Sequence, residues 1–397
     1  MSAAAEETQV AIVGGGPAGL VLALLLRRLG IGAVILEARS RAYCEQRVRA
    51  GVLEHGTVDL LESLGAGERM RRLGLVHGGI YLRFGGRSHH IDFPALTGKT
   101  ITVYGQHEVV KDLIAIHEAC GAPPRFEVAD VRIEGIEGER PCVRYRDAEG
   151  NARELRCEFV AGCDGFHGIA RGTIPAAVLS AYERVYPFAW LGILSESPPV
   201  CDELIYANHA RGFALFSQRS PSVQRMYLQC APDEDLSAWP DERIWDELQR
   251  RLEGVDPPQL ERGPIVQKGV TPMRSFVVEP MQYGRLFLAG DAAHIVPPTG
   301  AKGMNLAIAD VAVLAGALGR FYEGHGEEAL AAYSATCLQR VWKAERFSWW
   351  MTSMLHRNEA DDAFGRRLQL AELDYVAGSH AASQSLAENY VGLPMEA

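Results

Sequence analysis

Residues 14–19 read Gly-Gly-Gly-Pro-Ala-Gly, and this stretch decides the fold. A short run rich in β-branched residues, 8–13, precedes it, and an apolar run with helical spacing, 20–29, follows it. The glycines at the first, third and sixth places allow a tight turn, close approach of the backbone to a pyrophosphate, and close packing of helix on strand. The sequence therefore predicts a strand, a glycine turn, and a helix whose N-terminus faces a nucleotide.

A second strand completes this unit. Residues 33–36 are apolar and are followed by Glu37. In such units an acidic residue lies about 20 residues after the glycines, and Glu37 lies at about that distance. A carboxylate there can accept hydrogen bonds from both hydroxyls of an adenosine ribose. The predicted dinucleotide contacts of the unit are Gly14, Gly16, Ala18, Gly19 and Glu37. The unit alone does not distinguish FAD from NAD.

Composition limits the classes of function. The chain has 397 residues, 47% of them hydrophobic, and a net charge of −10, which argues against nucleic acid as a partner because phosphate binding needs clustered Lys and Arg. The N-terminus is short and acidic, and the apolar stretch 19–26 is too short to span a bilayer, so we expect a cytoplasmic protein with no membrane partner. Eight scattered cysteines without a C-x-x-C pair predict free thiols and no metal site.

The chain changes character after its first part. Four short runs rich in aromatic and branched residues, 186–194, 203–206, 212–218 and 225–230, predict a mixed or antiparallel sheet. Long helical patterns dominate from residue 301 onward, including 306–322 and 327–352.

Two further motifs indicate which dinucleotide binds. Cys163-Asp164-Gly165, with Arg171 after it, is one, and Gly290-Asp291 at the end of the predicted strand 285–289 is the other. A carboxylate at the end of such a strand can bind a ribityl hydroxyl of FAD. Each motif by itself is compatible with an ordinary turn. With the glycine turn before them, the two resemble the signatures of the FAD-dependent aromatic hydroxylases, the class A flavoprotein monooxygenases.

The resemblance runs from Thr8 to Pro394 and is strongest to the members of that family that hydroxylate 4-hydroxybenzoate. It is carried by segments 47–54, 203–209, 300–303, 342–350 and 388–394. It implies that NADPH reduces FAD, that O2 adds to the reduced flavin as a hydroperoxide, and that 4-hydroxybenzoate becomes 3,4-dihydroxybenzoate. It also implies a homodimer.

The expected fold is α/β with mixed α+β character. Residues 1–180 are expected to form a Rossmann-like FAD-binding domain, and residues 181–274 an inserted mixed or antiparallel sheet that binds substrate. Residues 275–397 are expected to return to the FAD-binding domain and end in a helical region that forms the dimer interface.

The resemblance assigns substrate roles residue by residue. Arg219 anchors the benzoate carboxylate, for which a planar guanidinium is suited by its two parallel hydrogen bonds. Ser217 and Tyr227 donate further hydrogen bonds to that carboxylate. At the other end of the ring, Tyr206 binds the phenol oxygen, Tyr390 is its partner, and His77 is the outer end of a proton relay. The carbonyl of Pro298 lies near the phenol.

Further residues are assigned to the two nucleotides. The resemblance places a helix N-terminus beside the flavin, where its positive end favours the anionic reduced form. Its FAD contacts are Arg47, Arg49, Val52, Gln106, Asp164, Asp291, Lys302, Gly303, Met304 and Asn305. Its NADPH contacts are Arg39, Arg41, Tyr43, His167 and Arg274. Two arginines in segment 39–43 suit a 2′-phosphate, which favours NADPH over NADH.

Two alternatives stay open from the sequence. The first is hydroxylation of another benzoate, such as 3-hydroxybenzoate or 4-aminobenzoate. The second is a non-catalytic protein in which the glycine turn of a nucleotide-binding fold is only structural.

Overall fold

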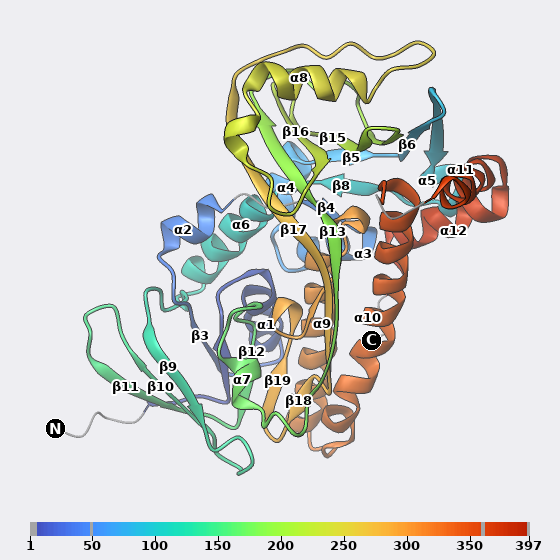
Figure 1. Cartoon of the computed structure of the whole chain (residues 1–397). Helices are drawn as coiled ribbons and strands as arrows, with labels where there is room; N and C mark the ends of the chain where they lie inside the picture. The colour runs from blue at the N-terminus through green and yellow to red at the C-terminus, as the bar shows by residue number, and fades with distance from the viewer. Residues whose placement is uncertain (1–5, 48–50, 359–361, 395–397) are drawn as a thin grey trace.

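The structure is a computed structural model that describes residues 6–47, 51–358 and 362–394 (Figure 1). The nucleotide-type sheet lies in the lower half of the view, and a second large sheet with helix α8 lies above it. The long strands β13 and β17 run between the two halves, and helix α10 descends along their side. The protein therefore has a mixed helix and sheet architecture of the α/β kind that the sequence predicts.

The lower sheet forms around the glycine turn. Its strand order is β18-β19-β12-β2-β3, in which β19, β12, β2 and β3 are parallel and β18 is antiparallel. The bounds are β2 Val10–Val13, β3 Ala33–Leu36, β12 Phe159–Gly162, β18 Gln282–Tyr283 and β19 Leu286–Leu288. Strands β2, β12 and β19 are apolar and buried along their whole length, as is typical of a parallel sheet that is covered on both faces. Segments far apart in the sequence thus end at one sheet edge.

Helix α1 (Pro17–Arg28) begins at the turn with Pro17 in its first position. A backbone N–H at that position has no partner within the helix, so proline, which lacks this N–H, is well tolerated there. It packs against α6 (Gln106–Ala119) and α9 (Gly303–Tyr322). The small helices of this half are α2 Arg41–Gln46, α3 His55–Ser63, α4 Gly67–Leu73 and α7 Ala170–Thr173. A small sheet of β4 (Val52–Leu53), β8 (Ile101–Val103) and β5 (Leu75–His77) lies beside them.

The upper sheet has eight strands among the described residues, in the order β20-β17-β13-β16-β15-β14-β6-β7. Its central strands are β13 Ser180–Ser195, β14 Leu204–His209, β15 Gly212–Ser220 and β16 Val223–Cys230, where the sequence predicts strands. Its outer strands are β6 Gly79–Phe84, β7 Arg87–Asp92, β17 Ile265–Glu279 and β20 His294–Ile295.

The upper sheet includes strands from outside the range 181–274. Residues 79–92 lie within the range expected for the FAD-binding domain, and here β6 pairs with β14 in parallel and extends the upper sheet with β7. Such a pairing joins segments more than 100 residues apart, and no local pattern encodes it. Strand β17 was also missed, because its burial does not alternate along its length.

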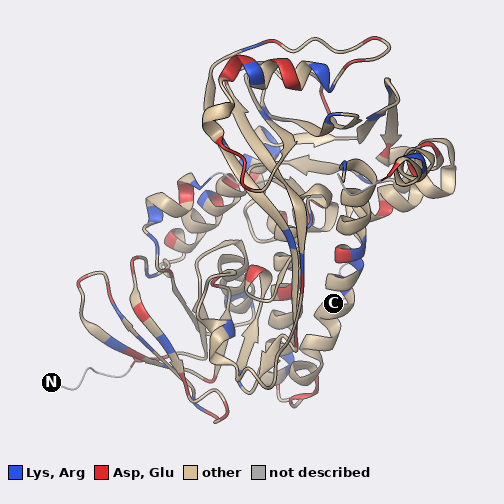
Figure 2. Cartoon of the chain, in the orientation of Figure 1, with Lys and Arg blue, Asp and Glu red and all other residues tan. Residues whose placement is uncertain are grey.

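The two faces of the upper sheet are covered differently. Helix α8 (Asp241–Arg250) covers one face, and Figure 2 shows both signs of charge along its exposed side. The other face packs on the C-terminal helices α10 (Glu328–Leu355), α11 (Ala363–Gly378) and α12 (His380–Val391). The short α5 (Phe93–Thr97) contacts α12. The remaining four-stranded sheet, β1-β11-β10-β9, comprises Glu6–Glu7, Ala152–Arg156, Cys142–Arg146 and Ala129–Glu134.

Helix α9 is a long apolar segment. Within the described part of the chain, it alone is long and apolar enough to cross a membrane by length and composition, which the stretch 19–26 is not. Of its most apolar window, 67% is buried inside the protein, and α1 and α10 pack against it. That burial is typical of a helix in the core of a folded domain.

Candidate active site

The glycine turn has one closed side and one open side. A Cβ at Gly14, whose φ is +109°, would lie 2.2 Å from the Cys163 carbonyl oxygen, and one at Gly19 would lie 2.0 Å from the Gly14 oxygen. A Cβ at Gly16 would meet nothing within 4 Å. Gly16 is also the N-cap of α1, and no side chain caps that helix end. The turn therefore presents free backbone N–H groups toward open space, which fits a pyrophosphate.

Glu37 follows β3 beside this turn, as the sequence predicts. Its carboxylate accepts hydrogen bonds from the backbone N–H of Gly15 at 2.6 Å and of Arg39 at 2.8 Å. Ionised carboxylate oxygens have further acceptor sites, so ribose hydroxyls can still bind. The two backbone bonds fix the orientation of the Glu37 carboxylate beside the turn.

The two later signatures meet at the same sheet edge, because β12 lies between β2 and β19. Asp164 follows β12, and its Oδ2 accepts from Ala170 N at 2.9 Å, whereas its Oδ1 is buried without a hydrogen-bond partner. Burial raises the pKa of Asp164. Arg171 joins the two signatures by donating to the carbonyls of Phe166 (2.6 Å) and Ala292 (2.9 Å). An unsatisfied buried oxygen at this edge fits a polar ligand.

The N-terminus of α9 is held by a buried polar cluster. Asn305 accepts from Glu54 N at 3.0 Å and donates to the carbonyls of Val52 and Ala301. Lys302 Nζ lies 2.7 Å from Glu54 Oε1, and it also donates to the Asn389 carbonyl and to that of Tyr390. Burial lowers the pKa of Lys302, and Glu54 counteracts that effect. Gly303 and Met304 form the first turn of the helix.

Sequence reasoning gave no role to two members of this cluster. Glu54 is buried between Lys302 and Arg340, whose Nη2 lies 3.1 Å from Glu54 Oε2. Arg340 also donates to the carbonyls of Leu393 and Pro394. The only available signal was that these residues are charged within otherwise apolar surroundings. The contacts of Glu54 with Lys302 and Arg340 span 248 and 286 residues of sequence, and they required the tertiary structure.

Two tyrosines meet in the core beside this helix. The hydroxyls of Tyr206 on β14 and Tyr390 on α12 are 2.6 Å apart, and Tyr206 also donates to the Thr299 carbonyl at 3.2 Å. Burial raises the pKa of both phenols, so they are neutral at physiological pH. The structure therefore brings together two residues 184 positions apart that the resemblance paired.

The Pro298 carbonyl lies within a short turn beside the tyrosine pair. It accepts a hydrogen bond from Ala301 N at 2.9 Å, inside the short turn Pro298–Gly300. The neighbouring Thr299 carbonyl is the one that Tyr206 contacts. The turn is tied to α10 by a 2.9 Å bond between the hydroxyls of Thr352 and Thr299.

Arg219, Ser217 and Tyr227 lie on the sheet face that carries Tyr206. Cross-strand register pairs Tyr206 with Leu215 and Leu215 with Tyr227, and Ser217 lies two residues farther along β15. Arg219 is half-buried as a residue, yet its Nε is enclosed without a hydrogen-bond partner. Nη1 donates to the Gln218 carbonyl at 2.9 Å and to Ser217 Oγ at 3.4 Å.

The surroundings of Arg219 favour an anionic ligand. Burial lowers its pKa and Tyr227 partly offsets this effect, and none of the described carboxylates forms an ion pair with it. A desolvated guanidinium needs an anion to complete its hydrogen bonds. The face between Arg219 and the tyrosine pair thus combines a cation, apolar walls and two phenols.

A second arginine in this region was missed by sequence reasoning. Arg225 pairs with Ser217 across the sheet and lies 5.2 Å from the Tyr227 ring centroid. Its Nη1 is buried without a partner, and a Cβ at Gly192 would lie 2.8 Å from its Nη2. Gly192 therefore leaves room for this guanidinium beside the Arg219 site.

His77 lies near Arg219 rather than in a hydrogen-bonded chain. It is 1% exposed, and neither ring nitrogen has a hydrogen-bond partner among the described residues. Burial lowers its pKa, and Glu203, Gln218 and Arg219 are its polar neighbours. The described residues thus contain no direct bond from His77 to either tyrosine.

The residues expected to contact NADPH fall into two groups. The guanidinium carbons of Arg39 and Arg47 lie 5.3 and 5.7 Å from the Tyr43 ring centroid, whereas Arg41 is paired with Glu45 and Glu118. His167 and Arg274 both contact the Phe166 ring, and Arg274 lies 3.5 Å from Glu183.

Two expected FAD contacts lie elsewhere in the sequence. Gln106 begins α6. Arg49 lies outside the described residues.

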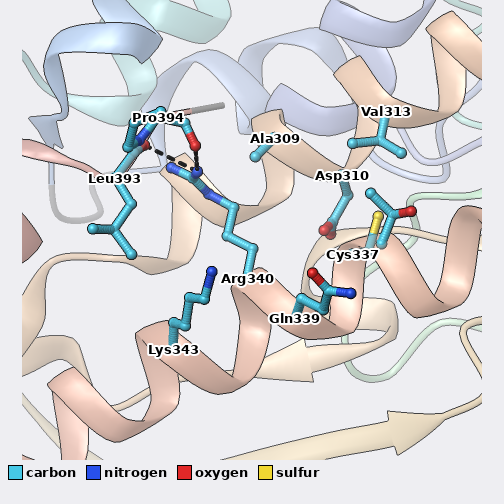
Figure 3. Close-up of a pocket in the computed structure, with 10 residues that line it drawn as sticks. Ala309, Asp310, Val313, Cys337, Gln339, Arg340, Lys343, Leu393 and Pro394 are labelled. Atoms are coloured by element: carbon cyan, nitrogen blue, oxygen red, sulfur yellow. Dashed lines mark hydrogen bonds between the residues drawn. The ribbon is translucent and has the colours of Figure 1, made fainter. Parts of the chain in front are cut away.

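A cavity of about 140 Å³ lies apart from these residues (Figure 3). Helices α9 and α10 and the segment Leu393–Pro394 line it, with Arg340 and Lys343 as its cationic side chains. Neither the substrate face nor the glycine turn contributes to its walls. The candidate substrate-site residues therefore lie on the sheet face and not at this cavity.

Comparison with known proteins identifies the family. The profile of the FAD binding domain family matches residues 7–348. The chain is 49% identical to p-hydroxybenzoate hydroxylase of Acinetobacter baylyi, over 98% of this chain and 96% of that protein. The chain belongs to the FAD-dependent aromatic hydroxylases. The expected enzyme class and its FAD cofactor are confirmed.

More distant relatives share the fold of this hydroxylase. A probable NADH-specific resorcinol 4-hydroxylase of Rhodococcus jostii is 28% identical over 83% of this chain and 62% of its own length. The crystal structure of a p-nitrophenol 4-monooxygenase from Pseudomonas putida superimposes with a TM-score of 0.84 at 20% identity, covering 98% of this chain and 100% of that one. The structure of an anhydrotetracycline hydroxylase from Streptomyces rimosus superimposes with a TM-score of 0.75 at 21% identity, covering 97% of this chain and 76% of that one.

Proposed function

We propose that this hydroxylase converts 4-hydroxybenzoate to 3,4-dihydroxybenzoate, consuming NADPH and O2 and releasing NADP and water. One observation carries the substrate assignment: a buried guanidinium without a carboxylate partner shares a sheet face with a buried tyrosine pair. A para-hydroxylated benzoate has the complementary ends, a carboxylate and a phenol. The name of the Acinetobacter baylyi relative supports the same substrate.

The carboxylate end is bound by Arg219, with Ser217 and Tyr227 beside it. The Ser217 hydroxyl now donates to the Arg225 carbonyl at 2.9 Å and must rotate to bind the ligand. The Tyr227 ring packs against Trp190, with ring centroids 4.7 Å apart and planes tilted by 46°, which limits the motion of its ring. Such fixed groups orient the substrate ring before reaction.

The phenol end is bound by Tyr206. Its hydroxyl hydrogen, now directed to the Thr299 carbonyl, turns toward the phenol oxygen, while Tyr390 stays its partner. Hydrogen bonds through the two tyrosines favour the ionised phenol, whose electron density activates the ring carbon beside it. His77 would end the proton path, and water must bridge it to Tyr390 because no direct bond joins them.

FAD supplies, when bound, the two-electron reduction and the activation of O2 that no side chain performs. We infer that Gly14, Gly16, Ala18, Gly19 and Glu37 hold its adenosine half. Arg49 and Gln106 are assigned to the adenine half and the pyrophosphate as well. The remaining FAD contacts are assigned to Arg47, Val52, Asp164, Asp291, Lys302, Gly303, Met304 and Asn305. The positive end of α9 then favours a negatively charged reduced ring. NADPH is assigned to Arg39, Arg41, Tyr43, His167 and Arg274, with Arg41 leaving its ion pairs.

We also propose a homodimer and a cytoplasmic location. Helix α11 exposes Phe364, Leu368 and Tyr375 at 69, 56 and 59%, and their spacing places them on one helix face. An apolar stripe of this kind is typical of a contact surface. The eight free cysteines suit a reducing compartment.

The test is a steady-state assay that follows nucleotide, O2 and product together. NADPH oxidation is expected to accelerate manyfold with 4-hydroxybenzoate and to yield 3,4-dihydroxybenzoate. The same assay is run with 3-hydroxybenzoate, with 4-aminobenzoate, and with NADH in place of NADPH. Faster turnover of another benzoate would overturn the substrate assignment, and a preference for NADH would overturn the nucleotide assignment.

A further inference from the structure

The turn that carries Asp291 is held from behind by two buried side chains. Asp310 on α9 accepts through Oδ2 from the backbone N–H of Gly290 at 2.9 Å and from His294 Nε2 at 2.6 Å. The side chains of His294 and Asp310 are 1% and 2% exposed. One carboxylate oxygen thus binds the beginning of the turn and the strand that follows it.

The backbone of this turn needs such support. Gly290 has φ of +63°, in the left-handed region, and a Cβ there would lie 2.9 Å from Ala307 Cβ on α9. The strand before the turn is held in a similar way, because the Tyr333 hydroxyl on α10 donates to the Leu288 carbonyl at 2.7 Å. Three contacts from α9 and α10 therefore define the path of residues 288–294.

The pair of Asp310 and His294 lies in the core. Burial lowers the pKa of His294, but Asp310, together with Asp291 and Glu345, raises it, and the pKa is raised overall. A buried ion pair contributes little net stability compared with apolar packing of the same volume, because desolvation opposes its Coulomb energy. Its directional contacts with a glycine turn point to a positioning role.

We propose that Asp310 and His294 are positioning residues that fix the Gly290–Asp291 turn for FAD, and so set how slowly the bound cofactor is released. The inference rests on the proposed contact of Asp291 with FAD and goes beyond it, since neither Asp310 nor His294 belongs to the assigned contacts. It does not depend on which benzoate is the substrate.

The experiment measures FAD release from the holoenzyme by the rise of free flavin fluorescence after dilution. Asp310→Asn keeps the size of the side chain but removes its charge, and we expect release at least ten-fold faster than from the wild type. The matched control is Ser334→Ala, which removes another buried bond from α10, the one that Ser334 Oγ accepts from Met281 N at 2.9 Å. Its release rate should stay within two-fold of the wild type.

Three outcomes would overturn the proposal. The first is a release rate for Asp310→Asn within two-fold of the wild type, and the second is equally fast release from Ser334→Ala, which would indicate general loosening. If Asp310→Asn is not recovered folded, His294→Gln tests the proposal instead, because it leaves Asp310 in place. FAD release from His294→Gln is expected to be at least three-fold faster than from the wild type. A rate within two-fold of the wild type is the third contrary result. A preference for another benzoate would contradict the proposed substrate but leave these rates unaffected.

Discussion

At the scale of single residues, the proposed substrate site contains buried groups that lack partners. Arg219 Nε and one nitrogen of Arg225 are buried without hydrogen bonds. Leaving such groups unsatisfied costs about 1–3 kcal/mol each, and more when they are charged. That cost is recovered when an anion binds, so the free site is preorganised for its ligand.

Arg219→Ala should weaken 4-hydroxybenzoate binding by about 3–5 kcal/mol, because the substrate carboxylate would be buried without its cation. The dissociation constant is measured from the change in flavin absorbance on titration. Arg243→Ala, on the far face of the sheet in α8, is the control and should bind normally. An unchanged constant in Arg219→Ala would remove this arginine from the site.

Tyr206→Phe should retain reduction by NADPH but form more hydrogen peroxide and less 3,4-dihydroxybenzoate. The ionised phenol loses a hydrogen bond worth about 1.5–3 kcal/mol, and the ring is then less reactive. Product and peroxide are quantified for each NADPH consumed. Full coupling in Tyr206→Phe would show that the phenol is activated elsewhere.

At the scale of elements, the end of α10 is attached to the substrate sheet by side chains. Trp190 Nε1 donates to His356 Nε2 at 2.6 Å, and Asn208 Nδ2 donates to the carbonyls of Met354 and Leu355. His356 also stacks on Phe188 at 4.7 Å. These contacts fix the angle between the helix and the sheet face that carries Tyr206.

The state of His356 makes this attachment sensitive to acid. Burial lowers the pKa of His356 to about 3, whereas an unfolded histidine titrates near pH 6.5. The unfolded chain therefore binds this proton first as the pH falls. The contribution of His356 to the free energy of unfolding is fully present above about pH 6.5 and is lost toward pH 3, by up to about 1.4 kcal/mol per pH unit.

His356→Phe should be less stable than the wild type at pH 8, because Trp190 loses its acceptor. The difference in free energy of unfolding should shrink by about 1.4 kcal/mol at pH 5.5, since the variant lacks this titration. Urea unfolding at both pH values measures it. An equal difference in free energy of unfolding at pH 8 and pH 5.5 would contradict the conclusion that the buried His356 is neutral.

At the scale of the whole molecule, the proposed dimer depends on the apolar stripe of α11. Leu368→Glu should give a monomer in light scattering coupled to size-exclusion chromatography, because a charge would be buried in the contact. Arg367→Glu changes a neighbouring exposed position off the stripe and should remain dimeric. If Leu368→Glu is also dimeric, the contact lies on another surface.

The sequence by itself determined the nucleotide-binding unit and four strands of the upper sheet. Gly14 and Gly19 are constrained by contacts within a few residues or with the adjacent strand, and the period of apolar residues along a segment follows its local burial. The pairing of Tyr206 with Tyr390 came from resemblance, and the structure confirms their contact.

Only the tertiary structure decided the rest. It assigned residues 79–92 to the substrate sheet, placed Glu54 between Lys302 and Arg340, and set Asp310 behind the Gly290 turn. These contacts join charged or polar groups far apart in the chain, and each exists because a buried group requires a partner. Which partner it finds depends on how the elements pack, and local sequence patterns do not encode that choice.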